Sequence, residues 1–377
     1  MKHRRKGGSH LNRLLEQDID RLIKKKDIYE AFIDKTIMVT GAGGLLGTII
    51  VLGFLKYSLT SNKIIHVVAL VHNIEKAERS YGEYASCKFL KFIEHDVTNE
   101  FCYTERQIDY IIHGASITAS HMFVSNPVET IRTALFGAEN ILKFAKECKV
   151  KGIIYLSSLE VYGKMIGKEN KVSLLSEENY GYIDILDVRS SYSESKRMVE
   201  NMFVSYAKEY AVSAKIARLT QTFGPGVSYT DRRVFAEFLR NAVEGEDIIL
   251  HTKGETVRNY CYTVDAAAAI LYILLYGDIG QAYNVSGDET TISIYDMAQM
   301  VCKKSKKDID IIVKDDIDVS MGYNPVIKIE LDNRKLKELG WRSSTNINSM
   351  IDRTLEYMQV EFEIGEWRKH AVKDKTK

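Results

Sequence analysis

Two polar segments of the chain carry side chains that could exchange a proton with a substrate. In the first, Tyr192 and Lys196 stand four residues apart, and on a helix such positions share one face. The lysine charge is expected to lower the pKa of the tyrosine, which can then exchange a proton with a substrate hydroxyl. The second segment, residues 156–163, ends a predicted strand in hydroxyls and an acid, with Ser158 and Glu160 as its candidate reactive side chains. Together the two segments predict an acid–base site.

A cluster of glycines near the start of the chain has the spacing GxxGxxG. It follows a short apolar run at residues 37–39 and precedes an apolar helical pattern at residues 45–55. Glycine at these places allows a tight turn, close approach of the backbone to a pyrophosphate and close packing of the helix on the strand. The helix N-terminus adds free N–H groups and the positive end of its dipole. The candidate dinucleotide-binding residues of this turn are Gly41, Gly44, Leu45, Leu46 and Gly47.

The end of the second predicted strand does not distinguish NAD from NADP. NAD enzymes usually carry an acid there, which binds the ribose hydroxyls. This chain has His72 and Asn73, so neither that acid nor an arginine for the 2′-phosphate of NADP is present. Asp96, followed by Val97 after the next strand, is the predicted partner of the adenine, with a solvated loop acid as the alternative. We expect NAD, and NADP is not excluded by these residues.

Short apolar runs alternate with helical patterns along the first 220 residues. Such alternation predicts an α/β fold with a doubly wound parallel (Rossmann) sheet. Beyond residue 220 the alternation loosens, which predicts a smaller C-terminal lobe over the carboxyl edge of the sheet, where these folds place their ligands. The expected strands are residues 37–39, 67–71, 92–93, 110–112 and 153–156. We expect an N-terminal helical extension at 1–33 and a dinucleotide-binding domain at 34–220. A mainly substrate-binding lobe follows at 221–365, and a polar tail at 366–377. Part of 262–290 is expected to return to the sheet.

Charge and composition argue against nucleic acid and membranes as binding partners. The formal net charge is +1, which gives no field to attract nucleic acid or an acidic membrane. No stretch approaches the ~20 apolar residues of a membrane span, and the basic run at residues 1–6 lacks the apolar core of a secretory signal. The five cysteines are scattered and without CxxC spacing, so we expect neither disulfides nor a metal site, and a reducing cytoplasm fits best.

Taken in order, these segments resemble the extended short-chain dehydrogenase/reductase family of nucleotide-sugar epimerases, dehydratases and decarboxylases. The resemblance runs from about Lys35 to about Tyr357. It includes residues 217–225, 258–265, 282–285 and 336–341, and the segment 112–116, which is similar to the one that lines the nicotinamide ribose. The cofactor-binding residues implied in that segment are Gly114, Ala115 and Ser116.

The resemblance implies NAD that is bound tightly and recycled, a nucleotide-diphosphate sugar as substrate, and a homodimer that associates through helices. Tyr192 would take the proton of the C4 hydroxyl while a hydride leaves C4 for the nicotinamide. Ser158 would hydrogen-bond the same oxygen. Lys196 would hold the nicotinamide ribose. A ketone at C4 acidifies its neighbours, which opens elimination, epimerisation or decarboxylation.

The residues around Glu160 favour two of these reactions. Simple 4-epimerases of the family generally lack an acid at that position, whereas dehydratases and UDP-glucuronate decarboxylases have one. The dTDP-glucose dehydratases have a second acid directly before it, where this chain has Leu159. The decarboxylases have an arginine three residues before the tyrosine, matched here by Arg189, which could bind a substrate carboxylate or form a structural ion pair.

Two further runs resemble the decarboxylases and supply arginines for a diphosphate. They are residues 231–234 with Arg233 and residues 258–264 with Arg258. Three positions depart from the family: Gln221 replaces an asparagine that faces the substrate phosphates, Ala134 replaces another asparagine, and residues 322–325 replace an Arg-x-Pro-Asp segment.

We therefore expect a decarboxylase-like or 4,6-dehydratase-like enzyme of polysaccharide biosynthesis. An epimerase or 4-keto-sugar reductase is the alternative, and a non-catalytic dinucleotide-binding sensor is a remote one.

Overall fold

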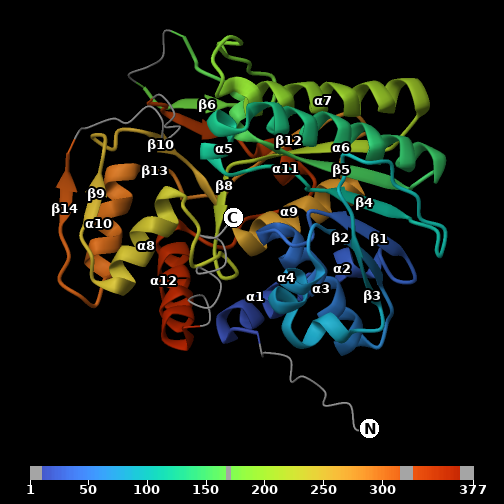
Figure 1. Cartoon of the computed structure of the whole chain (residues 1–377), viewed down its shortest axis with the longest axis horizontal. Helices are drawn as coiled ribbons and strands as arrows, with labels where there is room; N and C mark the ends of the chain where they lie inside the picture. The colour runs from blue at the N-terminus through green and yellow to red at the C-terminus, as the bar shows by residue number, and fades with distance from the viewer. Residues whose placement is uncertain (1–10, 167–170, 315–325, 366–377) are drawn as a thin grey trace.

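The alternating apolar runs form a seven-stranded parallel sheet in the computed structural model of the chain (Figure 1). The structure describes residues 11–166, 171–314 and 326–365, so the basic run at 1–6, the segment 322–325 and the tail 366–377 lie outside the described residues. The strand order is β12-β7-β5-β4-β1-β2-β3. The strands are β1 (Thr36–Thr40), β2 (His66–Val71), β3 (Leu90–Glu94), β4 (Tyr110–His113), β5 (Gly152–Ser158), β7 (Ala214–Leu219) and β12 (Ala282–Val285).

Helices cover both faces of this sheet, as its apolar strands require. Alternate residues of β1 point to opposite faces: Ile37 and Val39 join one core, and Met38 joins the other. Figure 1 shows α6 and α7 together on one side of the sheet and α3 on the other. The helices of the two layers are α3 (Leu45–Ser61), α4 (Ile74–Tyr81) and α9 (Thr263–Tyr276) on the first core, and α6 (Pro127–Glu147) and α7 (Ser190–Tyr210) on the second. The predicted α/β fold is confirmed.

The N-terminal helical extension predicted at residues 1–33 contains two helices in its described part. They are α1 (Arg13–Ile23) and α2 (Lys26–Glu30). The break falls in the lysine run, where Lys24 caps α1 and Lys25 precedes α2. Lys25 has φ −78° and ψ 63°, which lies outside the helical region and interrupts the helix there. Both helices join the first core, and α1 contacts α3, α9 and α12 (Ile347–Ile364).

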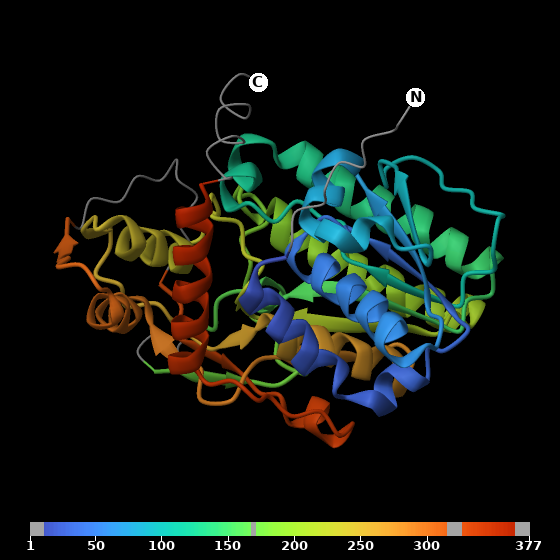
Figure 2. The ribbon, with the colours of Figure 1, turned by 90° about the horizontal axis from the view of Figure 1, so that it is seen from below.

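The remaining elements form a smaller lobe at one end of the sheet (Figures 1 and 2). The chain leaves the sheet after β7, builds part of this lobe, returns through α9 and β12, and then completes the lobe. Its strands pair in twos: β8 (Gln221–Phe223) with β11 (Tyr260–Tyr262), β9 (Ile248–Leu250) with β14 (Ile311–Val313), β10 (Val257–Arg258) with β13 (Ile292–Ser293), and β6 (Ser173–Leu175) with β15 (Ile329–Leu331). Its helices are α8 (Val234–Glu244), α10 (Ile294–Lys304) and α12, whereas α11 (Arg334–Glu338) contacts β12 of the sheet.

Two short elements connect the sheet to the site. They are α5 (Ser120–Ser125) after β4 and the 3-10 turn η2 (Leu159–Tyr162) after β5; a further 3-10 turn, η1 (Gly82–Ser86), follows α4. Among the described helices, none has both the length and the apolar composition to cross a bilayer.

Candidate active site

The glycine turn between β1 and α3 is built so closely that two of its positions require glycine. Gly41 has φ +68°, and a β-carbon placed on it would lie 2.8 Å from the carbonyl carbon of Gly114 and the amide nitrogen of Ala115. A β-carbon on Gly47 would lie 2.4 Å from the carbonyl oxygen of Gly41. Gly44 caps α3 without a side-chain hydrogen bond. The first turn of α3, with Leu45 and Leu46, therefore presents backbone N–H groups that suit a pyrophosphate.

The neighbouring strand end is fixed against this turn by Thr40. Its hydroxyl lies 2.8 Å from Nδ1 of His113 and accepts a hydrogen bond of 3.1 Å from the backbone N–H of Ala115. Burial and the charge of Lys196 lower the pKa of His113 to about 3, so its imidazole is neutral at physiological pH. Gly114, Ala115 and Ser116 are thus held beside the glycine turn, where the sequence predicts the nicotinamide ribose. Thr40 and His113 were not among the predicted site residues, although the segment 112–116 includes one of them.

At the predicted adenine end, the side chains have local partners. His72 and Asp96 are exposed, and Asn73 caps α4 by accepting a 2.7 Å hydrogen bond from the backbone of Lys76. Asp96 accepts hydrogen bonds of 2.9 Å from both the backbone N–H and the hydroxyl of Thr98, and the backbone bond holds the pKa of Asp96 below its ordinary value. Val97 is buried. The contacts of Asp96 suit a loop acid as well as an adenine ligand, so its role stays a prediction.

Tyr192 and Lys196 lie in the first two turns of α7, and both are buried. The ring of Tyr192 stacks on Phe123 of α5, with centroids 4.2 Å apart and planes 9° apart. Burial, with a further contribution from Glu160, raises the pKa of Tyr192, while hydrogen bonding by Ser158 and the charges of Arg189 and Arg233 act in the opposite direction. The predicted site residues near the tyrosine hydroxyl are therefore Ser158, Glu160, Arg189 and Arg233.

The expected lowering of the Tyr192 pKa by Lys196 is not found in this structure. The ammonium of Lys196 donates a 2.8 Å hydrogen bond to the carbonyl of Leu156 and lies 5.5 Å from the centroid of the tyrosine ring. Burial lowers the pKa of Lys196 itself to about 7, against an opposing contribution from Glu200. Removal of both groups from water thus outweighs their mutual attraction.

Glu160 and Arg189 form a bidentate ion pair next to the tyrosine. Nη1 and Nη2 of Arg189 each lie 3.1 Å from a different carboxylate oxygen of Glu160, and the hydroxyl of Ser193 donates a further hydrogen bond of 3.0 Å. The Arg189 and Glu160 side chains are only 14% and 19% exposed. Glu160 also donates its backbone N–H to the hydroxyl of Ser158. Both oxygens of Glu160 are therefore engaged, so it can act as a base only after the pair opens.

Leu159, where the dehydratases have an acid, points away from this pair. It is buried in a small apolar cluster with Val161, Tyr162, Leu175, Ile329 and Leu331. No proton donor can be supplied from that position.

The predicted phosphate arginines differ in how they are held. Arg233 forms an ion pair with Asp231, with hydrogen bonds of 2.6 to 3.1 Å, and also donates to the carbonyl of Thr222. Arg258 has a buried Nε that finds no hydrogen-bond partner within the described part of the chain. A buried donor without an acceptor is costly, so this position suits an anionic ligand. Gln221 is half-buried at the start of β8. It pairs with Tyr260 of β11, which follows Arg258 by two residues in the chain.

Ala134, the other departure from the family, is buried in the second core on α6. Within the described residues, no cluster of three His, Cys, Asp or Glu side chains could hold a metal ion.

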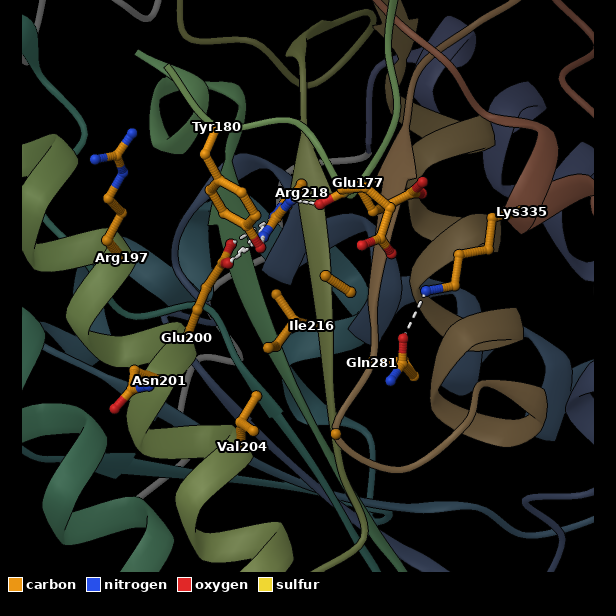
Figure 3. Close-up of a pocket in the computed structure, with 13 residues that line it drawn as sticks. Glu177, Tyr180, Arg197, Glu200, Asn201, Val204, Ile216, Arg218, Gln281 and Lys335 are labelled. Atoms are coloured by element: carbon orange, nitrogen blue, oxygen red, sulfur yellow. Dashed lines mark hydrogen bonds and ion pairs between the residues drawn. The ribbon is translucent and has the colours of Figure 1, made fainter. Parts of the chain in front are cut away.

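A second buried network lies against β5, the strand that ends at Ser158. Glu200, eight residues after Tyr192 on α7, accepts a 2.6 Å hydrogen bond from Ser157 and pairs with Arg218 at 2.8 Å. Figure 3 shows the guanidinium of Arg218 beside Glu200 and Tyr180, to both of which it donates hydrogen bonds. These side chains line a hollow of about 360 Å³. No predicted catalytic or cofactor residue lines this hollow. Glu200 was not among the predicted site residues, although it continues the spacing of four residues from Tyr192 to Lys196.

With this geometry in place, the comparisons identify the family. The model of the NAD dependent epimerase/dehydratase family matches residues 37–286 of the chain. The chain belongs to this family, so it is an NAD-dependent enzyme of the extended short-chain dehydrogenase/reductase type. The predicted family, fold and NAD dependence are thereby confirmed.

Curated relatives and solved structures extend the likeness over most of the chain. UDP-glucuronic acid decarboxylase 6 of Arabidopsis thaliana is 28% identical over 82% of this chain and 85% of its own length. UDP-glucuronic acid decarboxylase 1 of Xenopus tropicalis is 28% identical over 87% of this chain and 73% of its own length. A UDP-glucose 4-epimerase from Thermotoga maritima, solved with UDP-glucose, has a TM-score of 0.72 at 21% identity and covers 87% of this chain and 99% of its own. This structural likeness concerns the fold.

Proposed function

We propose that the protein is a nucleotide-sugar decarboxylase that acts on a nucleotide-diphosphate hexuronic acid through transient oxidation at C4. The observation that carries the proposal is the ion pair between Glu160 and Arg189 beside the buried Leu159. It supplies a guanidinium that already holds a carboxylate, and it leaves no second acid for the elimination of a hydroxyl. The decarboxylase relatives from Arabidopsis and Xenopus support the same reaction.

The residues present fit both the cofactor and the diphosphate. The glycine turn and the N-terminus of α3 would hold the pyrophosphate of NAD, and Lys196 would hold its nicotinamide ribose. When bound, NAD accepts a hydride from C4 and later returns it, so the cycle has no net redox change. Arg233 and Arg258 would hold the substrate diphosphate, because guanidinium groups bind phosphate oxygens through paired hydrogen bonds.

The chain's own groups would carry the proton and the charge. Tyr192 would take the proton of the C4 hydroxyl, and Ser158 would donate a hydrogen bond to the same oxygen. Arg189 would bind the C6 carboxylate in place of Glu160. The bond between C5 and C6 would then break, C6 would leave as carbon dioxide, and the bonding electrons would remain on the sugar, stabilised by the C4 carbonyl. A proton from solvent water would be added at C5, and Tyr192 would return its proton to the C4 oxygen when C4 is reduced again.

A 4,6-dehydratase is the second candidate, and the presence of Glu160 favours it. Glu160 could remove the C5 proton if a neutral sugar opened the ion pair. A dTDP-D-glucose 4,6-dehydratase of Dictyostelium discoideum is 27% identical over 72% of this chain.

Mass spectrometry after incubation of the purified protein with UDP-, dTDP-, GDP- and CDP-sugars tests the proposal. Loss of carbon dioxide from a uronic acid sugar is the expected result. Loss of water from a neutral sugar would replace the proposal by the dehydratase. An unchanged mass with an inverted C4 centre would replace it by an epimerase, and stoichiometric consumption of added reduced cofactor by a reductase.

We also propose that the enzyme works as a homodimer in the cytoplasm, in polysaccharide biosynthesis. Large apolar side chains are exposed on α6 and α7, which form one layer in Figure 1: Val128, Ile131 and Phe136 on α6, and Met198 and Val204 on α7. Such side chains in one layer suit an interface between copies. The free cysteines fit a reducing compartment. Light scattering of the purified protein should give twice the chain mass, and a monomer would contradict the dimer.

A further inference from the structure

The helix α1 lies before residue 37, where the match to the family begins, yet it is built into the first core. Its apolar face is buried against α3, α9 and α12. Figure 2 shows α1 beside α12 at the boundary between the sheet and the lobe. The helix therefore contacts both the part that carries the glycine turn and the part that covers it.

A charged residue lies in the middle of this buried face. Asp18 is 0% exposed, and its carboxylate accepts hydrogen bonds from the hydroxyl of Tyr262 and, at 2.7 Å, from Arg353. Nε of Arg353 also donates to the Tyr262 hydroxyl at 2.9 Å. Tyr262 ends β11, the strand that pairs with Gln221 to Phe223, and Arg353 lies on α12. A buried charge is tolerated only with such partners, so separating α1 from either one is costly.

The first turn of α1, which contains Leu15, lies near the helix that begins at the glycine turn. A β-carbon placed on Gly226 would lie 3.5 Å from Leu15 and 3.3 Å from Leu45, the first residue of α3. The backbone of Gly226 also lies close to the hydroxyl of Tyr357 on α12. The loop at Gly226 is therefore enclosed by α1, α3 and α12 directly beside the predicted pyrophosphate site.

We propose that α1 is a brace that holds the lobe against the dinucleotide-binding sheet and thereby slows the release of NAD, with Asp18 and Leu15 as positioning residues. The proposal rests on the proposed function in one respect, because a cofactor that is reduced and reoxidised within one turnover must remain bound until the hydride has returned. The brace supplies that retention from a helix that precedes the residues matched to the family.

Two matched leucines separate this role from general stability. Leu15 and Leu22 are both buried on the same face of α1, but Leu22 packs near Gly53 in the middle of α3, away from the glycine turn. Leu15→Ala and Leu22→Ala should both lower the melting temperature. Only Leu15→Ala should accelerate the dissociation of NADH, by about tenfold if the lost contact is worth a typical single interaction. Dissociation is measured by stopped-flow fluorescence with the full chain.

Asp18 is tested in the same assay with its own control. Asp18→Asn keeps the shape and removes the charge, and should accelerate NADH dissociation. Glu356→Gln removes an exposed ion pair between the same two helices, with Arg13, and should leave dissociation unchanged. If Asp18→Asn does not fold, Tyr262→Phe serves instead, because it removes the hydroxyl that hydrogen-bonds both Asp18 and Arg353 and leaves the ion pair between those two residues in place.

Equal dissociation rates for Leu15→Ala and Leu22→Ala, with an unchanged rate for Asp18→Asn or Tyr262→Phe, would overturn the brace. Because the rate concerns NADH alone, it is independent of which sugar is converted. A failure of the proposed decarboxylation would leave this measurement intact, and the two proposals can fail separately.

Discussion

Replacing Arg189 by alanine asks whether the guanidinium that holds Glu160 is the group that binds an acidic sugar. The two hydrogen bonds of 3.1 Å and the low exposure of both side chains describe a partly buried, charge-assisted contact. Hydrogen bonds to charged groups contribute about 1.5–3 kcal/mol. If the substrate carboxylate takes the place of Glu160, losing this contact should raise KM for a uronic acid sugar about 10- to 140-fold. The neutral sugar with the same nucleotide should be affected much less.

Glu160→Gln provides the complementary measurement. In a decarboxylation the bonding electrons of the departing carboxylate remain on the sugar, so no base at Glu160 is required and kcat should fall less than about tenfold. In a dehydration Glu160 would remove a proton, and its replacement should lower kcat by about 10²–10⁴-fold. Such a stalled variant would accumulate reduced nicotinamide, which is visible by absorbance.

Steady-state kinetics of the two variants with matched acidic and neutral sugars distinguish the outcomes. A large KM effect of Arg189→Ala confined to the acidic sugar supports the decarboxylase. A large kcat defect in Glu160→Gln without an effect of Arg189→Ala would refute the reasoning and favour the dehydratase. Full activity of both variants would show that the strand end from Ser158 to Gly163 is not the reacting site.

Three further predictions concern the cofactor and the acid–base pair. Gly44→Val should weaken NAD binding at least about 100-fold in calorimetry, because a side chain there enters the pyrophosphate path, and unchanged affinity would contradict the site. Tyr192→Phe should lower kcat by about 10²–10⁴-fold with NAD binding retained; near-normal turnover would exclude Tyr192 as the proton acceptor. The Lys196 pKa falls from 10.5 to about 7 on folding, so between these pH values the unfolded chain binds a proton here that the folded protein does not. The free energy of unfolding should therefore rise with pH by up to about 1.4 kcal/mol per unit relative to Lys196→Met, and parallel denaturant curves at pH 7, 8 and 9 would disprove this.

The local pattern of the sequence was sufficient for five of the seven strands of the sheet and for which residues gather near Tyr192. The five predicted strands are found because short apolar runs between helical patterns are typical of a parallel sheet, whereas β7 and β12 were not among the expected strands. The local pattern does not predict which side chains form ion pairs or hydrogen bonds with one another. The contact of Arg189 with Glu160 depends on side-chain orientation, and that of Asp18 with Tyr262 and Arg353 joins residues hundreds of positions apart. The balance between burial and charge at Tyr192 and Lys196 likewise depends on exposure, which spacing alone does not give.

The late return of the chain to the sheet has a consequence for how the protein is made. The edge strand β12 pairs with β7 only after residues 282–285 have been synthesised, about 60 residues later than β7 itself. Until then the edge of β7 presents unpaired backbone groups, which can recruit a strand from another chain. A nascent or truncated chain that ends near residue 220 should thus aggregate.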